Sequence, residues 1–422
     1  MSTAPHLPAT DPGELALVMG GGGARAAYQV GMLRALARRM PDLQVPIITG
    51  VSAGAINAVH LAAHPGSFAE AVHDLSELWA SLRIENVFRV DSPHLTRNLL
   101  RWGLQLVSGG LIRRGGDEMR SLVDTAPLRT FLLRALDVGH RSDAPIAGIR
   151  ANLDSGRLRA LAISTSSYTT GRSITWVEGR DGLVPWERPM RRARLERITV
   201  DHILASAALP LIFPAVSIHG EWYGDGGIRL SAPLSPALRL GASRILAIST
   251  RFARTEEEEG RPQVEGYPPP AQVAGQLMNA VFLDLLDQDS WRVEQTNDLL
   301  DRVPPAARGD LRVVDIVTLR PSVDLGKLAA DFEIELPRFF RFLLRGLGTD
   351  RTRSPDLLSF VLFEPGFVNR LMDLGERDAE TRMGELEHLL HSRETGQSTT
   401  EVASSADPTS AEGDAETSSA SN

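Results

Sequence analysis

Short apolar runs alternate with longer segments of helical periodicity through the first 250 residues. The run LALVM, residues 15–19, is followed by four glycines, and ARAAYQVGMLRALARRM, residues 24–40, has helical spacing until a proline ends it. VPIIT, residues 45–49, runs into a tight turn, and AGAINAVHLAAH, residues 53–64, predicts a second helix. This strand–helix–strand–helix order predicts an α/β fold with a mostly parallel sheet covered by helices.

Three later apolar runs predict further strands, and the composition changes after residue 250. The runs are LRALAIST (158–165), SITWVE (173–178) and SRILAIST (243–250). A charged, proline-rich stretch then predicts an exposed loop, and the last thirty residues have the composition of a disordered tail. We therefore expect a loose leader (1–12), an α/β domain (13–250), a loop or linker (251–272), a largely helical region (273–391) and a disordered acidic tail (392–422).

Composition narrows the class of protein. The chain has no cysteine, which excludes disulfides and thiolate chemistry. The first twelve residues lack a basic start and an apolar core, and no apolar run is long enough to cross a membrane, so we expect a cytoplasmic protein. The net charge is −8, of which six negative charges follow Arg393. No basic stripe with interleaved aromatic residues is present, so we expect no nucleic-acid partner.

The first feature with chemical content is the glycine-rich turn MGGGGARAAYQVG. Backbone N–H groups at the start of a helix bind an anion, either a phosphate or the oxyanion of acyl transfer. A dinucleotide fingerprint is the rival interpretation, because Gly21, Gly23 and Ala26 fit G-x-G-x-x-G/A. That motif needs an acidic residue at the end of the second strand, but Asp42 precedes the strand. The pattern therefore disfavours a dinucleotide site, and it leaves open whether the loop binds a phosphate or an oxyanion.

The second feature is Gly50-Val51-Ser52-Ala53-Gly54, between the second predicted strand and its helix. A serine at the tip of a sharp strand-to-helix turn needs small neighbours two residues on either side, and glycine occupies both places. One interpretation is a nucleophile elbow presenting Ser52, and the other is an ordinary turn that contains a serine. The five residues alone leave both open.

The third feature is the sequence WYGDGG, in which Asp225 precedes Gly226 and Gly227. These residues make a turn readily, but a serine nucleophile also needs a nearby base. None of the histidines has the glycine-flanked loop expected of a catalytic histidine, so we expect surface or structural roles for them. The histidines considered are His60, His64, His73, His202, His219, His388 and His391.

Together the three motifs resemble the patatin-like phospholipases, whose pattern is a Gly-Gly-Gly-x-Arg/Lys-Gly loop, then Gly-x-Ser-x-Gly, then Asp-Gly-Gly or Asp-Gly-Ala. The resemblance covers about residues 14–250, and the flanks AAYQVGMLRAL, LVDTAPLRTFL and ILASAALPLIFPAV are similar to bacterial members. It implies a three-layer α/β/α fold, here with a helical C-terminal extension. One departure is Ala26, where the family usually has glycine; a methyl group there is expected to narrow the loop or shift one N–H group.

The resemblance implies a serine acyl-ester hydrolase of the phospholipase A or lysophospholipase type, with Ser52 as nucleophile and Asp225 as base. It places the oxyanion hole at the amides of Gly21, Gly22, Gly23 and Ala24. Arg25 is expected to brace that loop, and Gly50, Gly54, Gly226 and Gly227 to support the motifs. No cofactor and no metal is implied. The implied partners are a lipid or other acyl-ester substrate and a membrane surface at its periphery; the oligomeric state is not indicated.

Two arginine-rich apolar segments, residues 95–115 and 336–348, suit contact with a lipid surface. The alternative for both is a helix packed on the core with arginines at its rim. Two other functions stay open on the sequence. One is a catalytically silent protein of the same fold that binds lipid or regulates; Ala26 leaves it open, and the intact Ser52 and Asp225 count against it. The other is a histidine-dependent esterase using His388 or His391.

Overall fold

The computed structural model describes residues 14–89, 121, 123–260, 267–333 and 356–391. Its central element is a ten-stranded sheet. The strands are β1 (Leu15–Met19), β2 (Ile47–Val51), β3 (Ala160–Ser167), β4 (Ser173–Gly179), β5 (Glu187–Arg188), β6 (Arg191–Leu195), β7 (Val216–Ile218), β8 (Glu221–Asp225), β9 (Arg244–Ile248) and β10 (Asp315–Leu319). Their order is β10-β9-β1-β2-β3-β4-β6-β5, with β8 pairing with both β3 and β7. The five strands from β10 to β3 are mutually parallel, so the predicted mostly parallel sheet is confirmed.

Helices and short 3-10 turns connect these strands. The α-helices are α1 (Ala27–Arg39), α2 (Ala53–Ala63), α3 (Phe68–Ala80), α4 (Ile84–Val87), α6 (Ala126–Ala135), α7 (Ala147–Asp154), α8 (Val200–Ser206), α9 (Ser235–Arg239), α10 (Glu256–Glu259), α11 (Pro270–Phe282), α12 (Asp284–Asp301), α13 (Leu325–Ala330), α15 (Asp356–Val361), α16 (Pro365–Thr381) and α17 (Met383–His391). The 3-10 turns are η1 (Gly23–Ala26), η2 (Gly226–Ile228) and η3 (Pro305–Ala307). No described helix is both long and apolar enough to span a lipid bilayer.

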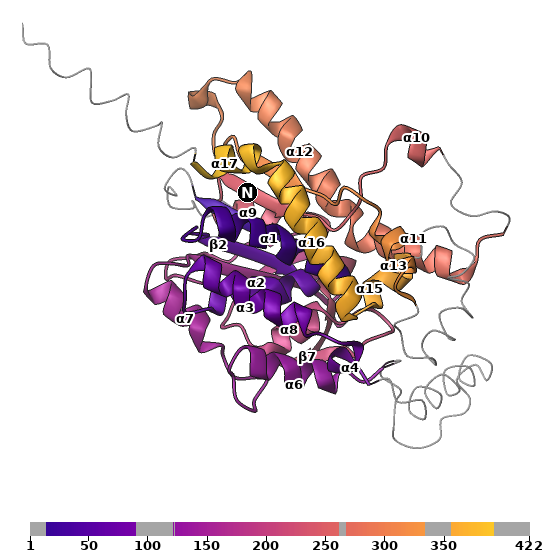
Figure 1. The fold of residues 1–422 in the computed structure, drawn as a ribbon. Helices are drawn as coiled ribbons and strands as arrows, with labels where there is room; N and C mark the ends of the chain where they lie inside the picture. The colour runs from indigo at the N-terminus through magenta and orange to yellow at the C-terminus, as the bar shows by residue number, and fades with distance from the viewer. Residues whose placement is uncertain (1–13, 90–120, 122, 261–266, 334–355, 392–422) are drawn as a thin grey trace, which may run out of the picture.

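The central strands are buried on both faces, which makes a three-layer fold. Along β1, Leu17 and Met19 join the core cluster that contains α1, α2, α3 and α16, whereas Ala16 and Val18 join a second cluster with α9 and α12. Successive side chains of a strand point to opposite faces, so this alternation assigns one helical layer to each face of the sheet. Figure 1 shows α1, α2 and α16 covering one face.

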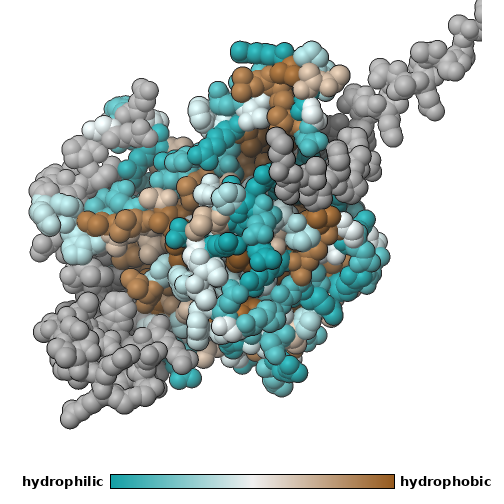
Figure 2. All heavy atoms as spheres, turned by 180° about the vertical axis from the view of Figure 1, so that it is seen from behind, coloured by the Kyte–Doolittle hydropathy of each residue, from teal (hydrophilic) through white to brown (hydrophobic). Residues whose placement is uncertain are grey.

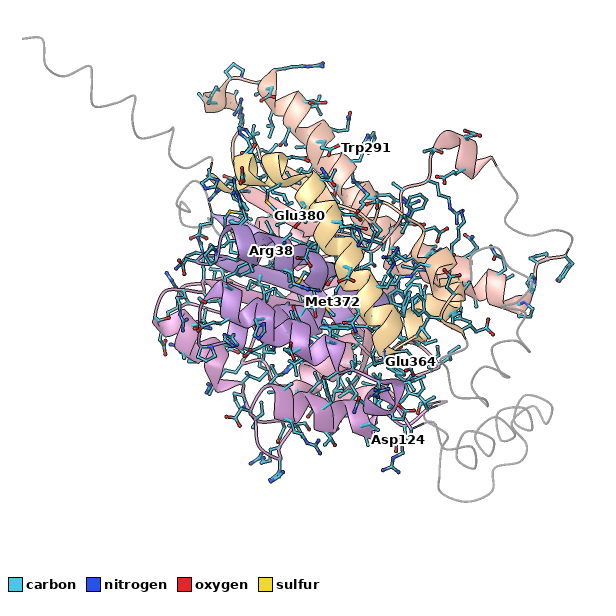
Figure 3. The ribbon with its side chains drawn as sticks, in the orientation of Figure 1. Arg38, Asp124, Trp291, Glu364, Met372 and Glu380 are labelled. Atoms are coloured by element: carbon cyan, nitrogen blue, oxygen red, sulfur yellow. The ribbon has the colours of Figure 1, made fainter. Side chains whose placement is uncertain are left out.

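The chain after residue 250 is built into the same core. It contributes β10, which pairs in parallel with β9, and α16, which packs along α1. Met372 of α16 lies against α1, and Arg38 of α1 donates to Glu380 of α16 at 2.9 Å (Figure 3). The predicted helical character of this region is confirmed, and β10 is an addition to it.

The predicted linker between residues 251 and 272 contains α10, and α11 begins within it at Pro270. The expected domain boundaries stay predictions. The leader, the acidic tail and the two segments expected to contact lipid, residues 95–115 and 336–348, lie outside the described residues.

Candidate active site

Ser52 occupies the tip of a sharp turn between β2 and α2, in a conformation that side chains rarely adopt. It is the N-cap residue of α2, with φ 56° and ψ −132°. A Cβ atom on Gly50 would lie 2.5 Å from the Gly54 carbonyl oxygen, and one on Gly54 would lie 2.4 Å from the Gly20 carbonyl oxygen. Both flanking glycines are therefore required by close backbone packing, which favours a nucleophile elbow over an ordinary turn.

Strand β8 brings Asp225 to this serine. On β3, Ser164 pairs with Val51, the last residue of β2, and the next residue, Thr165, pairs with Asp225 of β8. Strand β8 therefore pairs with β3 just beyond the point where β2 ends. The Ser52 hydroxyl donates a hydrogen bond of 2.6 Å to Asp225 Oδ2. The two residues predicted from separate motifs are thus in direct contact.

The Asp225 carboxylate is held in one orientation by the glycines that follow it. Its Oδ1 accepts a hydrogen bond of 2.9 Å from the Gly227 amide. A Cβ atom on Gly226 would lie 2.1 Å from the Ser164 carbonyl oxygen, and one on Gly227 would lie 2.2 Å from the Phe282 ring. The Asp-Gly-Gly sequence therefore fits a turn that has no room for side chains.

Burial determines the electrostatics of Asp225. Its exposed fraction is 0%, and this burial raises the pKa of Asp225 to about 7. The hydrogen bonds from the Ser52 hydroxyl and the Gly227 amide act in the opposite direction, because both favour the charged form. A carboxyl group with a pKa near 7 is matched to proton transfer at neutral pH.

Ser206, at the end of α8, fixes the backbone at the elbow. Its Oγ accepts a hydrogen bond of 3.0 Å from the Ser52 amide and donates one of 2.7 Å to the Ser164 carbonyl oxygen. Ser206 is not predictable from the sequence, because it lies inside the apolar run ILASAALP, where one serine gives no signal.

The glycine-rich loop between β1 and α1 has its carbonyl groups tied down. The Gly20 carbonyl accepts from the Gln29 side chain at 2.7 Å, and the Gly21 carbonyl from the Thr250 hydroxyl at 2.8 Å. The next carbonyl, that of residue 22, accepts from the Arg25 amide at 3.1 Å. These bonds orient the intervening peptide groups and rigidify the loop.

The amides of the same loop are available beside the serine. Within the described parts of the chain, no hydrogen bond uses the amide of Gly22 or Gly23 as donor. The φ values of Gly22 and Gly23, 148° and 57°, lie in the left-handed region that favours glycine. A Cβ atom on Gly21 would lie 3.1 Å from Ser52 Cβ, and Gly23 lines the same cavity as Ser52. Free amides next to a nucleophile can stabilise an oxyanion.

Arg25 is buried behind this loop and held by the C-terminal part of the chain. Its exposed fraction is 3%, its Nη2 donates to Asp356 Oδ1 at 2.6 Å, and its Nε donates to Ser359 Oγ at 2.7 Å. The guanidinium also lies 4.6 Å from the centre of the Phe360 ring. Arg25 therefore contacts α15, and neither Asp356 nor Ser359 was identified from the sequence.

Ala26 is accommodated without distortion. Its φ of −66° and ψ of −12° are ordinary helical values, and its side chain is fully buried in the core. Glycine is not required for the backbone at this position. The expected narrowing of the loop therefore has no counterpart in the backbone conformation.

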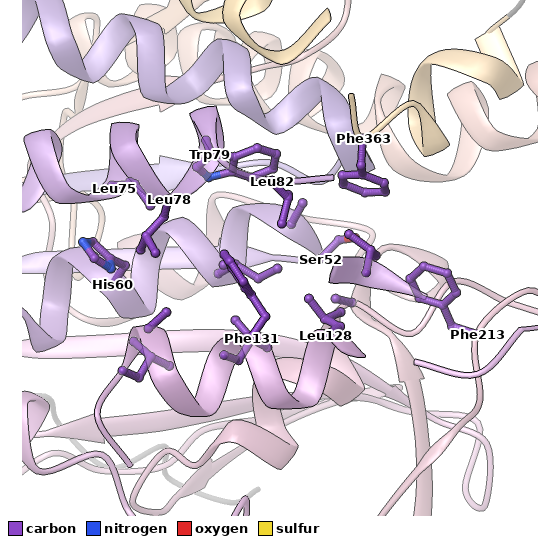
Figure 4. Close-up of a pocket in the computed structure, with 18 of the residues that line it drawn as sticks. Ser52, His60, Leu75, Leu78, Trp79, Leu82, Leu128, Phe131, Phe213 and Phe363 are labelled. Carbon is purple, nitrogen blue, oxygen red and sulfur yellow. The ribbon is translucent and has the colours of Figure 1, made fainter. Parts of the chain in front are cut away.

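An apolar cavity opens from Ser52 and runs between α2, α3 and α6 (Figure 4). Its walls are almost entirely aliphatic and aromatic side chains. They include Ile56, Leu75, Leu78, Trp79, Leu82, Leu128, Phe131, Leu132, Phe213 and Phe363. Figure 4 shows Ser52 and His60 toward opposite ends of this cavity. Such a lining suits a hydrocarbon chain attached to a group that reaches the serine.

His388 and His391 lie near the amino ends of the parallel strands, whereas Ser52 lies at their carboxyl ends. His388 and His391 belong to α17, and Arg244, the first residue of β9, donates to the Leu389 carbonyl of the same helix at 3.1 Å. Ser52 instead follows the last residue of β2, which runs parallel to β9 through β1. A strand of five residues separates its amino and carboxyl ends by about 15 Å. Neither histidine is placed to act on the serine.

His60 lines the cavity, but its ring is hydrogen-bonded to the backbone and not to Ser52. Its Nε2 lies 3.1 Å from the Ala71 carbonyl oxygen, an acceptor, so this nitrogen carries the proton. Burial lowers the pKa of His60 to about 4, which keeps the ring neutral at neutral pH. Ser52 Oγ is bonded to Asp225 and not to this ring.

Sequence and structure comparisons relate the chain to known proteins. The family model described as "Patatin-like phospholipase" matches residues 17–238. No curated protein shows significant sequence similarity to the chain. Among solved structures, VipD from Legionella pneumophila is 16% identical, with 90% of this chain and 67% of that chain covered and a TM-score of 0.39. Human GIVD cytosolic phospholipase A2 with methyl gamma-linolenyl fluorophosphonate is 16% identical, with 90% and 58% covered and a TM-score of 0.41. The chain thus spans less than two thirds of that human protein.

Proposed function

Because the chain belongs to the patatin-like phospholipase family, we propose that it is a serine acyl-ester hydrolase that acts on lipids through a Ser52–Asp225 dyad. Family membership supports lipid ester hydrolysis in general. The finer proposal is an enzyme of the phospholipase A or lysophospholipase type that works through an acyl-enzyme. The observation that carries it is the 2.6 Å hydrogen bond from the Ser52 hydroxyl to the buried carboxylate of Asp225.

In the first step, Ser52 Oγ attacks the carbonyl carbon of the ester while its proton passes to Asp225 Oδ2. The raised pKa of Asp225, about 7, supports this role, because the carboxylate can both accept and release a proton near neutral pH. Serine is a weak nucleophile until a base takes its proton.

The oxyanion that forms in this step is received by the glycine-rich loop. We assign the donors to the amides of Gly22, Gly23 and Ala24, with Gly21 completing the wall beside the serine. Removal of a single donor from such a hole costs about 3 kcal/mol of transition-state stabilisation. The tied carbonyl groups of the loop support this assignment, because they keep the amide orientation fixed before substrate arrives.

Collapse of the tetrahedral intermediate breaks the bond to the leaving alcohol, whose oxygen takes the proton back from Asp225. The acyl group is then attached to Ser52 Oγ. In the second half, Asp225 accepts a proton from water as the water oxygen attacks the acyl carbon. Ser52 Oγ leaves with that proton, and a free carboxylic acid is released.

The apolar cavity supports an acyl chain as the part of the substrate that the enzyme encloses. Its walls are aliphatic and aromatic and it begins at Ser52, so an ester carbonyl at the serine would extend its chain between α2 and α6. Each methylene group that the cavity buries stabilises the bound hydrocarbon chain by roughly 0.8 kcal/mol. We therefore place the acyl chain in the cavity and the head group outside it.

A lipid substrate also requires contact with a lipid surface, which we propose is peripheral. Seen from behind, apolar side chains gather over α11 (Figure 2). On this helix Val273 and Leu277 are 48% and 61% exposed, and Phe282 at its end packs against the turn that follows Asp225. An exposed apolar stripe beside the site suits contact with lipid.

The test is intact-mass analysis after treatment with a fluorophosphonate, with hydrolysis of a phospholipid and of a simple ester measured in parallel. We expect one adduct on the wild type, none on Ser52→Ala, and slow labelling of Asp225→Asn. His391→Ala is the control, because it removes an exposed histidine at the far edge of the sheet and is expected to label at the wild-type rate.

Two results would contradict the proposal. If the folded wild type forms no adduct, with or without lipid micelles, the chain is a silent member of the family that binds lipid or regulates. If His388→Ala or His391→Ala abolishes labelling while Asp225→Asn does not, the enzyme is a histidine-dependent esterase.

A further inference from the structure

We infer that a brace built by α11 and α15 holds the oxyanion loop in its active position, and that Asp356 is the positioning residue on which the brace depends. The brace consists of Asn279 and Phe282 of α11 and of Asp356, Ser359 and Phe360 of α15. All five residues lie beyond the segment 17–238 that matches the family model. This inference rests on the proposed function, since it concerns the loop to which the oxyanion is assigned.

On one side, α15 contacts the oxyanion loop directly. Arg25 donates to the carboxylate of Asp356 at 2.6 Å and to the Ser359 hydroxyl at 2.7 Å. The Ser359 hydroxyl donates in turn to the backbone carbonyl of residue 356 at 2.6 Å. A Cβ atom on Gly23 would lie 2.1 Å from the Phe360 carbonyl oxygen, so the loop backbone rests on the backbone of α15.

On the other side, α11 contacts the turn that carries the proposed base. The Phe282 ring fills the space that a side chain on Gly227 would need. The amide of Gly227 donates the hydrogen bond of 2.9 Å to the carboxylate of Asp225. Helix α11 therefore packs against the turn that follows the proposed base, and α15 packs against the oxyanion loop.

Two contacts join the halves of the brace. The Asn279 side chain donates to Asp356 Oδ2 at 2.8 Å, so each oxygen of that carboxylate is bonded, one to each half of the site. The centroids of the Phe282 and Phe360 rings lie 6.3 Å apart. A Cβ atom on Gly275 would lie 3.0 Å from Asp356 Cβ, so α11 and α15 are close-packed where the carboxylate lies. The proposed base and the oxyanion loop thus share one support.

The charge of Asp356 is essential to this support. The side chains of Arg25 and Asp356 are 4% and 7% exposed, so each neutralises the other away from water. Removing one partner of a buried pair leaves an uncompensated charge, which is strongly unfavourable. The guanidinium of Arg25 would then move toward water and displace residues 22–24, whose amides are assigned to the oxyanion.

The test compares Asp356→Asn and Ser359→Ala with the wild type in ester hydrolysis, fluorophosphonate labelling and amide hydrogen exchange. For Asp356→Asn we expect kcat and the labelling rate to fall together by about tenfold or more, with KM nearly unchanged, because oxyanion stabilisation acts in the transition state. We expect faster exchange in residues 20–27. Ser359→Ala should show the same pattern to a smaller extent, and Asp356→Glu should recover part of kcat.

Glu14→Gln is the matched control, since Glu14 forms a partly buried ion pair with Arg159 away from the site. It should leave kcat and exchange in residues 20–27 unchanged. The brace is disproved if Asp356→Asn folds and keeps wild-type kcat and exchange in that loop, or if Glu14→Gln lowers kcat equally. If the wild type hydrolyses no ester, the proposed function fails, and the exchange measurement still decides whether Asp356 holds the loop.

Discussion

Asp225 combines a functional advantage with a cost in stability. Burial raises its pKa to about 7 in the folded chain, from a value of 3.8 for an unperturbed aspartate. Between these values the folded state binds the proton more tightly than the unfolded state does. The contribution of Asp225 to stability is therefore greatest below pH 4 and falls as the pH rises toward 7. The carboxyl group that we propose as the base therefore lowers the stability of the fold at neutral pH.

This pKa predicts the pH dependence of hydrolysis. The base must be ionised to accept the serine proton, so kcat/KM should rise with pH through a midpoint near 7 and level off above it. The measurement is kcat/KM for a soluble ester between pH 5 and pH 9. A profile that stays flat down to pH 5 would mean that the base ionises at an ordinary carboxyl pKa.

Single residues differ in how far the sequence predicts them. Ser52 and Asp225 were predicted because the turns that present them need glycines at fixed nearby positions, which is a local constraint. Asp356 and Ser359 were not, because they follow Arg25 by 331 and 334 residues and contact it only after folding. The expectation for Ala26 also came from a local motif, and the ordinary helical φ of Ala26 shows that the backbone at this position does not need glycine.

Helix α2 lines the proposed acyl cavity along its length. Ala53, Ile56 and His60 face the cavity, at spacings of three and four residues that put them on one side of a helix. At ~1.5 Å per residue, the eight residue steps from Ser52 to His60 span about 12 Å, which is the extended length of an acyl chain of about ten carbons. Helix geometry thus favours a chain of medium length.

Blocking the middle of this cavity should change chain-length preference without harming the chemistry. In Ile56→Trp the indole would fill the cavity one turn beyond the serine, so we expect hydrolysis of decanoyl esters to fall by about tenfold or more. Acetyl and butyryl esters should be hydrolysed within about twofold of the wild-type rate, since they end before this position. Measuring kcat/KM across chain lengths checks this, and an equal loss for all chains would place the acyl group elsewhere.

The C-terminal part of the chain is packed as closely as any part of the core. A Cβ atom on Gly31 of α1 would lie 1.9 Å from the Met372 carbonyl oxygen, and one on Gly375 of α16 would lie 2.1 Å from the Tyr28 carbonyl oxygen. The two helices approach until their backbones touch, at glycines that each contributes. Separation of α16 would therefore expose the main core.

Adding one methyl group at this contact should destabilise the whole fold. We expect Gly31→Ala to lower the free energy of unfolding by about 2 kcal/mol or more, because the obstructing atom belongs to the backbone. Gly384→Ala, on α17, has nothing within 4 Å of the new methyl and should be neutral or stabilising by up to ~1 kcal/mol. Denaturant unfolding compares them, and equal stability of the two variants would contradict the packing argument.

The fold was predictable where patterns were long and repeated. The alternation of strands and helices up to residue 64 gave the parallel sheet, and β9 matched the run SRILAIST. β10 was missed because DIVTL is a five-residue segment with three apolar residues in a mainly helical region, and periodicity cannot distinguish so short a segment from buried helix. The position of β8 beside the end of β2 depends on sheet register, for which the local sequence has no signal.

The distance along the chain between Arg25 and Asp356 also has a consequence for biosynthesis. Ser52 and the glycine-rich loop are made early, but the carboxylate that neutralises Arg25 follows 331 residues later. At roughly 5–20 residues per second this interval lasts about 20 to 70 s. A ribosome-bound chain thus contains the proposed nucleophile well before it contains the proposed support for the oxyanion loop. On the proposed function, a nascent chain that does not yet include Asp356 would therefore hydrolyse esters more slowly than a chain that includes it.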